Sequence, residues 1–233
     1  MSLLRKLLNL FGGTPDSGDA HDRRRSLARL RRNLRGQPRQ VEYFHQVDDP
    51  ESHLACQTLK EFGQRHEIHL TIHLVAPPPD EPGADREQLL AQARMDASAA
   101  ATTLGLSFHD PGTQPTAQNC RRASEILAAN LAFDQFCELA PRVGNALWLD
   151  DTDAILDLSN EFATTSEEEV IADRERGSAR RAKLGEDRSA TFYFEGKWYR
   201  CVDGLRALED RLRKDGARRA TQTEPTEPIL PTR

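Results

Sequence analysis

The strongest constraint on the fold is a strand, a helix and a second strand that follow one another between residues 40 and 75. The first segment, 40–47, alternates in polarity as a strand with one buried face does, and in 67–75 every second residue is apolar. Between them, Asp49 suits the N-cap of a helix, Pro50 suits its first position, and Gly63 is expected to mark its end. Because parallel strands need a crossover of about this length, the sequence predicts a right-handed parallel βαβ unit.

Residues 85–184 are expected to form a block of helices. We expect these helices over residues 86–104, 117–139, 145–162 and 166–184. The last segment is highly charged, so a solvated helix face is its simplest interpretation. Ser166 and Glu169 at its start form a capping-box pattern.

Strand patterns return after Gly185. Residues 190–194 and 197–202 are rich in aromatic and β-branched residues and flank a tight turn, which predicts a hairpin. A last helix is expected over 203–214, where leucines recur at helical spacing. The pattern therefore predicts an α/β chain in the order βαβ, helical block, ββα.

This order is also that of a thioredoxin fold with an all-helical insertion, and three stretches add a more specific likeness. They are Tyr43 to Ala55, Asn145-Ala-Leu-Trp148 with Asp150 and Asp151, and Leu184 to Leu205. In these stretches the chain resembles the DsbA-like thioredoxin family, in particular the branch with 2-hydroxychromene-2-carboxylate isomerases and kappa-class glutathione transferases. The resemblance covers about 40–214 and implies a thioredoxin-like βαβ–ββα sheet domain with a large all-helical insertion.

The resulting domain organisation has five parts. They are an amphipathic basic N-terminal arm (1–39), the thioredoxin βαβ half (40–84), the helical insertion (85–184), the thioredoxin ββα half (185–214) and a tail (215–233) that is expected to be disordered.

The resemblance implies thiol-disulfide oxidoreductase, glutathione-dependent isomerase or glutathione transferase activity, with glutathione as the cofactor. The equivalent catalytic positions are Asp48, Asp49, Pro50, Ser52 and His53. In the family, a cysteine thiolate or a serine hydroxyl stands at the helix start, where Asp49 stands here. A carboxylate there competes for the same helix amides and repels a thiolate. The four cysteines form no Cys-x-x-Cys pair, and Cys56 lies about two turns into the helix. We therefore expect altered or lost thiol chemistry.

The resemblance also implies ligand-binding positions at Ala190, Thr191 and Asp203. Ala190 matches the family's cis-proline, and a trans bond is expected there because a cis bond before a non-proline residue costs about 3–4 kcal/mol. Asp203 matches the aspartate of a Gly-x-Asp-Arg motif whose glycine and arginine are absent. The sequence leaves open what Arg200 and Cys201 do, at a place where the family often has Trp and Gly.

Several of these polar side chains are expected near one end of the sheet. They are Asp48, Asp49, Ser52, His53, Thr191 and Asp203. Such a cluster could do acid-base work or bind a metal. The favoured interpretation is simpler: Asp49 and Asp203 are helix caps and His53 is a polar residue on a helix surface, so no metal site is predicted.

The charge distribution is uneven. Residues 1–42 hold ten Lys/Arg and four Asp/Glu, a balance of +6, whereas the remaining residues have a balance of −11. Two amphipathic helices are expected in the arm, over 1–13 and 23–39. Such an arm could dock on its own domain, on a second copy in a homodimer, on another partner or on an anionic membrane. Nucleic acid is not expected, because no aromatic residue interleaves the arginines.

These features leave two hypotheses. The first is a divergent member of the oxidoreductase and isomerase family that binds a thiol or another small molecule. The alternative is a non-catalytic interaction module that docks a partner or a membrane through its arm. No signal-peptide pattern and no run of about 18 apolar residues is present, so the protein is expected in the cytoplasm, with peripheral membrane attachment left open.

Overall fold

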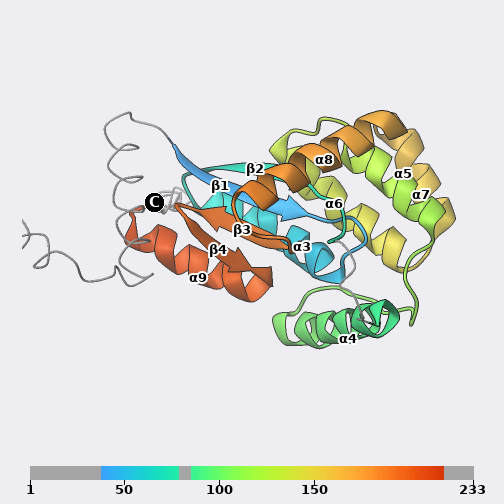
Figure 1. Ribbon diagram of the computed structural model, residues 1–233, viewed down its shortest axis with the longest axis horizontal. Coiled ribbons are helices and arrows are strands. Elements are labelled where there is room, and N and C mark those ends of the chain that lie inside the picture. Colours follow the sequence, from blue (N-terminus) through green and yellow to red (C-terminus); the bar gives the residue numbers. More distant parts are fainter. Residues whose placement is uncertain (1–37, 79–84, 218–233) are drawn as a thin grey trace, which may run out of the picture.

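A four-stranded sheet organises the computed structural model, which describes residues 38–78 and 85–217 (Figure 1). The strands are β1 (Arg39–His45), β2 (Ile68–Leu74), β3 (Thr191–Phe194) and β4 (Lys197–Arg200), in the order β2-β1-β3-β4. β1 pairs with β2 in parallel and with β3 antiparallel, and β3 and β4 form a hairpin. The predicted thioredoxin order is therefore confirmed. The predictions for most of the arm and the tail fall outside the described residues.

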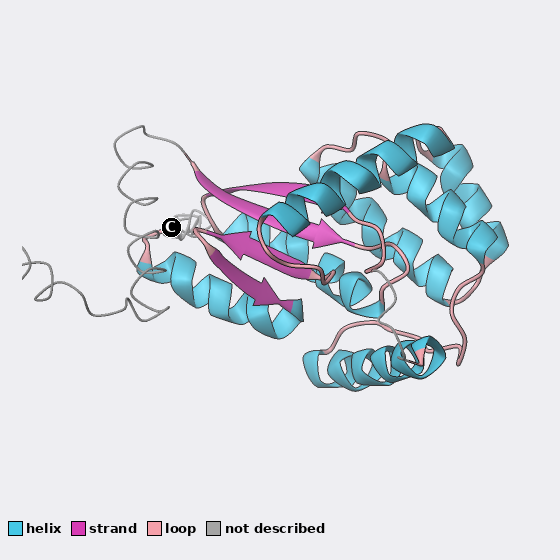
Figure 2. Cartoon of the chain, viewed as in Figure 1, coloured by secondary structure: helices cyan, strands magenta, loops and turns pink. Residues whose placement is uncertain are grey.

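Seven helices lie within the described residues. They are α3 (Pro50–Arg65), α4 (Arg86–Leu104), α5 (Ala117–Leu127), α6 (Phe133–Trp148), α7 (Thr152–Glu161), α8 (Glu167–Lys183) and α9 (Cys201–Lys214). Figure 2 shows α5 to α8 bundled beside the sheet, with α4 set apart from this bundle. α3 contacts α4, α6 and α9, so it joins the sheet half to the insertion. None of these helices is both long and apolar enough to cross a membrane.

The two faces of the sheet differ in character. Tyr43 stacks on Phe192 with the ring centres 4.6 Å apart, on the face where both belong to the apolar core. On the opposite face, Phe44 stacks on His73 at 4.9 Å and contacts Trp198 at 5.3 Å. The helix pair α3 and α9 thus covers an apolar face, while the other face carries more polar groups. This alternation follows from the two-residue period of a strand.

Several helix boundaries differ from the predictions. Two helices were expected over 117–139 and 145–162, but this stretch forms three. Asn130 and Asp150 have left-handed φ angles of 52° and 50° and separate these helices. α3 does not end at Gly63 but continues to Arg65. A Cβ on Gly63 would lie 2.6 Å from the Phe133 ring, so this glycine serves close helix packing instead of helix termination.

The charged helix α8 is more than a solvated face, which corrects that interpretation. Val170, Gly177 and Arg181 are buried along it. A Cβ at Gly177 would lie only 2.0 Å from the Leu74 carbonyl oxygen, so α8 rests directly on the backbone of β2. Arg180 donates to both carboxylate oxygens of Glu42, at 2.7 and 2.6 Å, and fastens the helix to the sheet.

Candidate functional site

The N-terminus of α3 is closed by its own capping residue. Asp49 has the extended backbone of an N-cap, and its Oδ2 accepts hydrogen bonds from the Ser52 amide at 3.0 Å and the Ser52 hydroxyl at 2.7 Å. Ser189, in the loop before β3, also bonds to this carboxylate. Burial raises the pKa of Asp49 to about 6, although its hydrogen bonds to Ser52 and Ser189 act in the opposite direction. The carboxyl group therefore titrates near neutral pH while it accepts a hydrogen bond from the amide of the third helix residue, Ser52.

Beneath this cap lies a buried polar network. The Tyr43 hydroxyl donates to the Ser52 carbonyl at 3.2 Å and lies 3.1 Å from Nδ1 of His45. The Ser52 hydroxyl accepts from the Gln46 amide at 3.2 Å. Burial, followed by the nearby His53, lowers the pKa of His45 to about 3, so this imidazole stays neutral at physiological pH. The network positions Ser52 toward Asp49 and carries no charge of its own.

Cys201 lies beside the same helix start. It is the first residue of α9, with a left-handed φ of 54°, and its amide donates to the Ala190 carbonyl at 2.8 Å. Its thiol donates to Oε2 of Glu51 at 2.8 Å. Burial raises the pKa of Cys201, and the carboxylates of Glu51, Asp49 and Asp203 raise it further. The thiol is therefore held protonated by its burial and by the carboxylates around it.

A small cavity of about 70 Å³ borders this thiol. Its lining includes Glu51, Leu54, Asp96, Cys201 and Asp203, from α3, α4 and α9. Cavities that hold drug-sized ligands measure roughly 300–1,000 Å³. This cavity is thus too small for a tripeptide such as glutathione.

Of the three positions predicted to bind a ligand, Ala190 and Thr191 make contacts within the chain instead. Ala190 is fully buried with a left-handed φ of 53°. The buried hydroxyl of Thr191 donates to the Arg188 carbonyl at 3.2 Å. Asp203 is exposed in the first turn of α9, and the helix starts at Cys201 without a side-chain cap. The expectation that Asp203 caps this helix is therefore wrong, because the helix begins two residues earlier.

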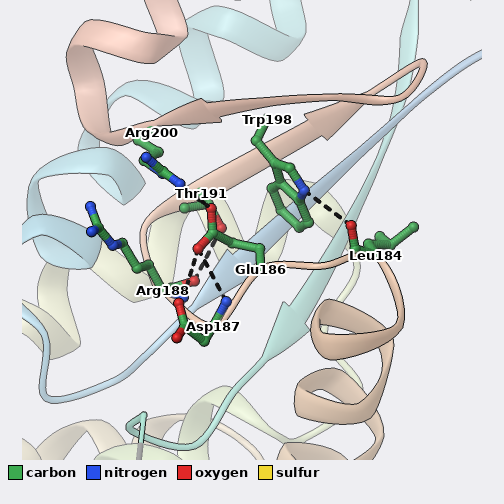
Figure 3. A network of polar contacts seen from close by, with 7 residues as sticks. All are labelled: Leu184, Glu186, Asp187, Arg188, Thr191, Trp198 and Arg200. Carbon is green, nitrogen blue, oxygen red and sulfur yellow. Dashed lines mark hydrogen bonds and ion pairs between the residues drawn. The ribbon is translucent and has the colours of Figure 1, made fainter. Parts of the chain in front are cut away.

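Arg200 braces the loop that precedes β3 (Figure 3). The buried carboxylate of Glu186 accepts from Nε and Nη2 of Arg200 at 3.1 and 2.7 Å, and from the amides of Asp187 and Arg188 at 3.1 and 3.3 Å. Burial alone would raise the pKa of Glu186, but these donors outweigh it and lower the pKa. Trp198 adds a hydrogen bond from Nε1 to the Leu184 carbonyl at 3.3 Å. Arg200, which the sequence left open, thus fixes the loop that carries Ser189 and Ala190.

His53 and Asp48 point to other partners. His53 is 2% exposed, so its expected place on a helix surface is wrong. Its ring packs near Phe108 and against Gly144, where a Cβ would come within 2.1 Å of Nδ1. Burial lowers the pKa of His53 to about 4. Asp48 accepts from the Gln46 amide side chain at 3.0 Å.

The structure thus brings together fewer of these side chains than the sequence predicted. It brings Asp49 and Ser52 together and places Asp49 and Asp203 within electrostatic range of Cys201. Among residues 38–78 and 85–217, no group of three or more His, Cys, Asp or Glu side chains could hold a metal ion. Sequence reasoning did not single out Ser189 or Glu51 and found no role for Cys201. No local pattern joins these residues, since Cys201 and Glu51 are 150 positions apart.

Comparison with known proteins supports the architecture. No family model matches the chain, and no match was found among curated proteins. The chain is similar in structure to 2-hydroxychromene-2-carboxylate isomerase, with a TM-score of 0.56 and 18% sequence identity over 76% of this chain and 96% of the isomerase. A protein assigned as a disulfide isomerase from Nitrosomonas europaea matches with a TM-score of 0.49 and 13% identity, over 76% of this chain and 98% of that protein. At 18% identity the likeness to the isomerase establishes the fold alone, a DsbA-like thioredoxin fold with a helical insertion.

Proposed function

We propose that this chain, which has the DsbA-like thioredoxin fold, is a divergent member of the oxidoreductase and isomerase family that no longer performs thiol chemistry at the start of α3. The observation that carries the proposal is the Asp49 cap. Its Oδ2 accepts hydrogen bonds from both the amide and the hydroxyl of Ser52, at 3.0 and 2.7 Å. A thiolate that approached this helix would meet a carboxylate instead of free donors, and like charges repel.

The cysteines support the same proposal. All four are free thiols, and for each of them burial is the largest cause of a raised pKa. The pKa is about 12 for Cys120 and Cys137 and lies higher for Cys56 and Cys201. Since the thiolate is the nucleophile in disulfide exchange, thiols of this kind react slowly at pH 7. Free cysteines also agree with the reducing cytoplasm, which we propose as the compartment.

The test combines a binding and an activity measurement on the full chain. Calorimetric titration with glutathione, at up to about 10 mM, should show no saturable binding. The protein should also not accelerate the reduction of insulin by dithiothreitol. The matched variant is Asp49→Cys in a Cys201→Ser background. Its new thiol sits at a helix N-terminus without Asp49, so its pKa should fall below that of a free cysteine, about 8.5. Saturable glutathione binding by the unaltered chain would overturn the proposal.

The charge contrast favours one second candidate, an interaction module that docks through its arm. The balance of +6 in residues 1–42 against −11 in the remainder favours contact between the arm and an acidic surface, either an anionic membrane or a second copy of this body. Removing residues 1–37 keeps Arg39, whose guanidinium donates to the Asp215 carbonyl at 2.6 Å. This truncation should change the oligomeric state or the co-sedimentation with anionic vesicles. If neither changes, the second candidate is eliminated.

A further inference from the structure

A second and larger cavity lies at the sheet edge formed by β2. It has a volume of about 500 Å³, and none of its lining residues belongs to α3 or to the loop before it. Its apolar floor is formed by Ile72, Leu74, Leu127, Leu131 and Phe136. Phe136 also packs edge-on against His45, with the ring centres 5.4 Å apart. This phenylalanine therefore separates the cavity from the polar network beneath Asp49.

The walls of this cavity are held by contacts that do not depend on a ligand. α8 forms one wall and rests on β2, because Gly177 allows the Leu74 carbonyl to approach the helix closely. The Ala76 amide donates to the Ser178 hydroxyl at 3.0 Å and adds a second tie between α8 and the end of β2. The opposite wall includes residues 163–165, and the Thr165 amide donates to the Glu125 carbonyl of α5 at 3.0 Å. A cavity of this volume, in which an apolar floor lies beneath a mostly polar lining, has the dimensions of a small-molecule site.

The charges at the rim limit what can bind. Asp173 and Arg176 line the cavity and pair with each other at 2.8 Å, so their charges offset one another. Glu169 also lines the rim, and its carboxylate accepts a hydrogen bond from the Thr165 hydroxyl, which is neutral. The three charged side chains therefore leave one net negative charge above an apolar floor. Such an arrangement attracts a cation and disfavours an anion.

We infer that this cavity binds a small organic cation, an ammonium group carried on an aromatic or aliphatic body. The apolar body would cover Ile72 and Leu131, the partly exposed residues of the floor, and the ammonium group would lie at the rim near Glu169. The inference goes beyond the proposed loss of thiol chemistry and does not depend on it, because the two sites share no lining residue.

The test uses two fluorescent probes that have the same ring and opposite charge. Dansylcadaverine ends in an ammonium group, and the dansyl derivative of 6-aminohexanoic acid ends in a carboxylate. Titration into the full chain should give saturable fluorescence with dansylcadaverine, and about 10-fold weaker binding of the anionic probe. That ratio corresponds to roughly 1.4 kcal/mol, the order of one charge interaction near a protein surface.

Two variants assign the binding to this cavity. Ala172→Trp fills the space beside α8 and should weaken dansylcadaverine at least 10-fold, whereas Ala179→Trp, an exposed position on the same helix outside the lining, should not. Glu169→Gln keeps an acceptor for Thr165 and should reduce the preference for the cation to about 2-fold. Glu175→Gln, exposed on α8, is its control.

Three results would overturn the inference. The first is no saturable signal from dansylcadaverine at up to about 1 mM. The second is equal binding of the two probes, which would refute the role of the rim charge. The third is unchanged binding in a folded Ala172→Trp variant, which would place the probe elsewhere on the molecule. Circular dichroism of each variant establishes that it is folded.

Discussion

The start of α3 and the cavity at β2 differ in whether their own side chains satisfy the polar groups that lie there. At α3, Asp49 accepts hydrogen bonds from the amide and hydroxyl of Ser52, and the Cys201 thiol donates a hydrogen bond to Glu51. At β2, a cavity of about 500 Å³ remains, and its rim has one carboxylate, Glu169, that no cation among the described rim residues balances. The comparison teaches that local hydrogen bonds can occupy the polar groups at one place in a thioredoxin fold while the packing of its insertion leaves a cavity at another.

The largest effect should come from Gly177, which allows α8 to form a wall of the cavity. In a helix, replacing glycine by alanine normally stabilises by about 0.5–1 kcal/mol. Here the new methyl group would lie 2.0 Å from the Leu74 carbonyl oxygen, so Gly177→Ala should instead lower the free energy of unfolding by about 2–4 kcal/mol. Urea denaturation measures this change. The exposed Glu175→Ala is the control and should stay within about 0.5 kcal/mol.

The second effect concerns the loop before β3, which Glu186 and Arg200 hold in place. Glu186→Leu would leave the amides of Asp187 and Arg188 without their acceptor and would release Arg200. Because the carboxylate is buried, we expect a loss of about 2–3 kcal/mol in the free energy of unfolding. Arg200→Met removes the other partner, whose side chain is about half exposed, and should cost less. Equal losses in the two variants would show that the backbone contacts of Glu186 contribute little.

Two carboxylates, Asp49 and Glu42, should contribute to the free energy of unfolding with opposite dependences on pH. The pKa of Asp49 is raised to about 6, so its favourable contribution is complete below about pH 4 and is lost as the pH rises through 6. Relative to the unaltered chain, Asp49→Asn should therefore become more stable by roughly 1–2 kcal/mol between pH 4 and pH 7.5. Denaturant titrations at a series of pH values would reveal the trend, and a difference that does not vary with pH would contradict it.

Glu42, under α8, should behave in the reverse manner. Burial acts to raise its pKa, but Arg180 and His73 outweigh burial and lower the pKa to about 2. A lowered pKa contributes stability above the ordinary pKa of about 4.5, and this is lost as the pH falls from 4.5 toward 2. Glu42→Gln should therefore cost roughly 1–2 kcal/mol at pH 7, and less as the pH falls toward 3. Equal costs at pH 7 and pH 3 would contradict the assignment.

The smallest effect concerns the reactivity of Cys201. Removing the negative charge of Glu51 lowers the pKa of the neighbouring thiol, so Glu51→Gln should speed alkylation of Cys201 by iodoacetamide about 3- to 5-fold. Mass spectrometry at pH 8 resolves the cysteines, and Cys120 in the same chain is the internal control. A rate that rises equally at both cysteines would indicate loosening of the fold instead of a local charge effect.

Much of the architecture could be predicted because its signals are local. The parallel pair β1 and β2 follows from two-residue alternation, and the caps Asp49 and Ser166 precede their helices as expected. The boundaries that failed lie where a distant contact decided the outcome. Gly63 resembles a helix end in sequence, yet Phe133 from α6 packs against it and α3 continues.

The candidate site was less predictable for the same reason. The residues 48–53 could be located because they adjoin a strand and a helix cap, whereas the environment of His53 depends on Gly144 from the insertion. Cys201 gained its neighbour Glu51 only when α9 packed beside α3. Likewise, nothing near Arg180 in the sequence indicates a bond to Glu42, which is 138 positions away.

Periodicity, caps and turn residues act over a few positions, and they were enough to specify the strands, most helices and the carboxylate at the start of α3. Other features depend on the packing of elements that lie about a hundred residues or more apart. They are the pairing of Cys201 with Glu51, the position of α8 on β2 and the cavity at β2. Those choices are made by steric fit and by burial of charge in the folded domain, and no short stretch of the chain encodes them.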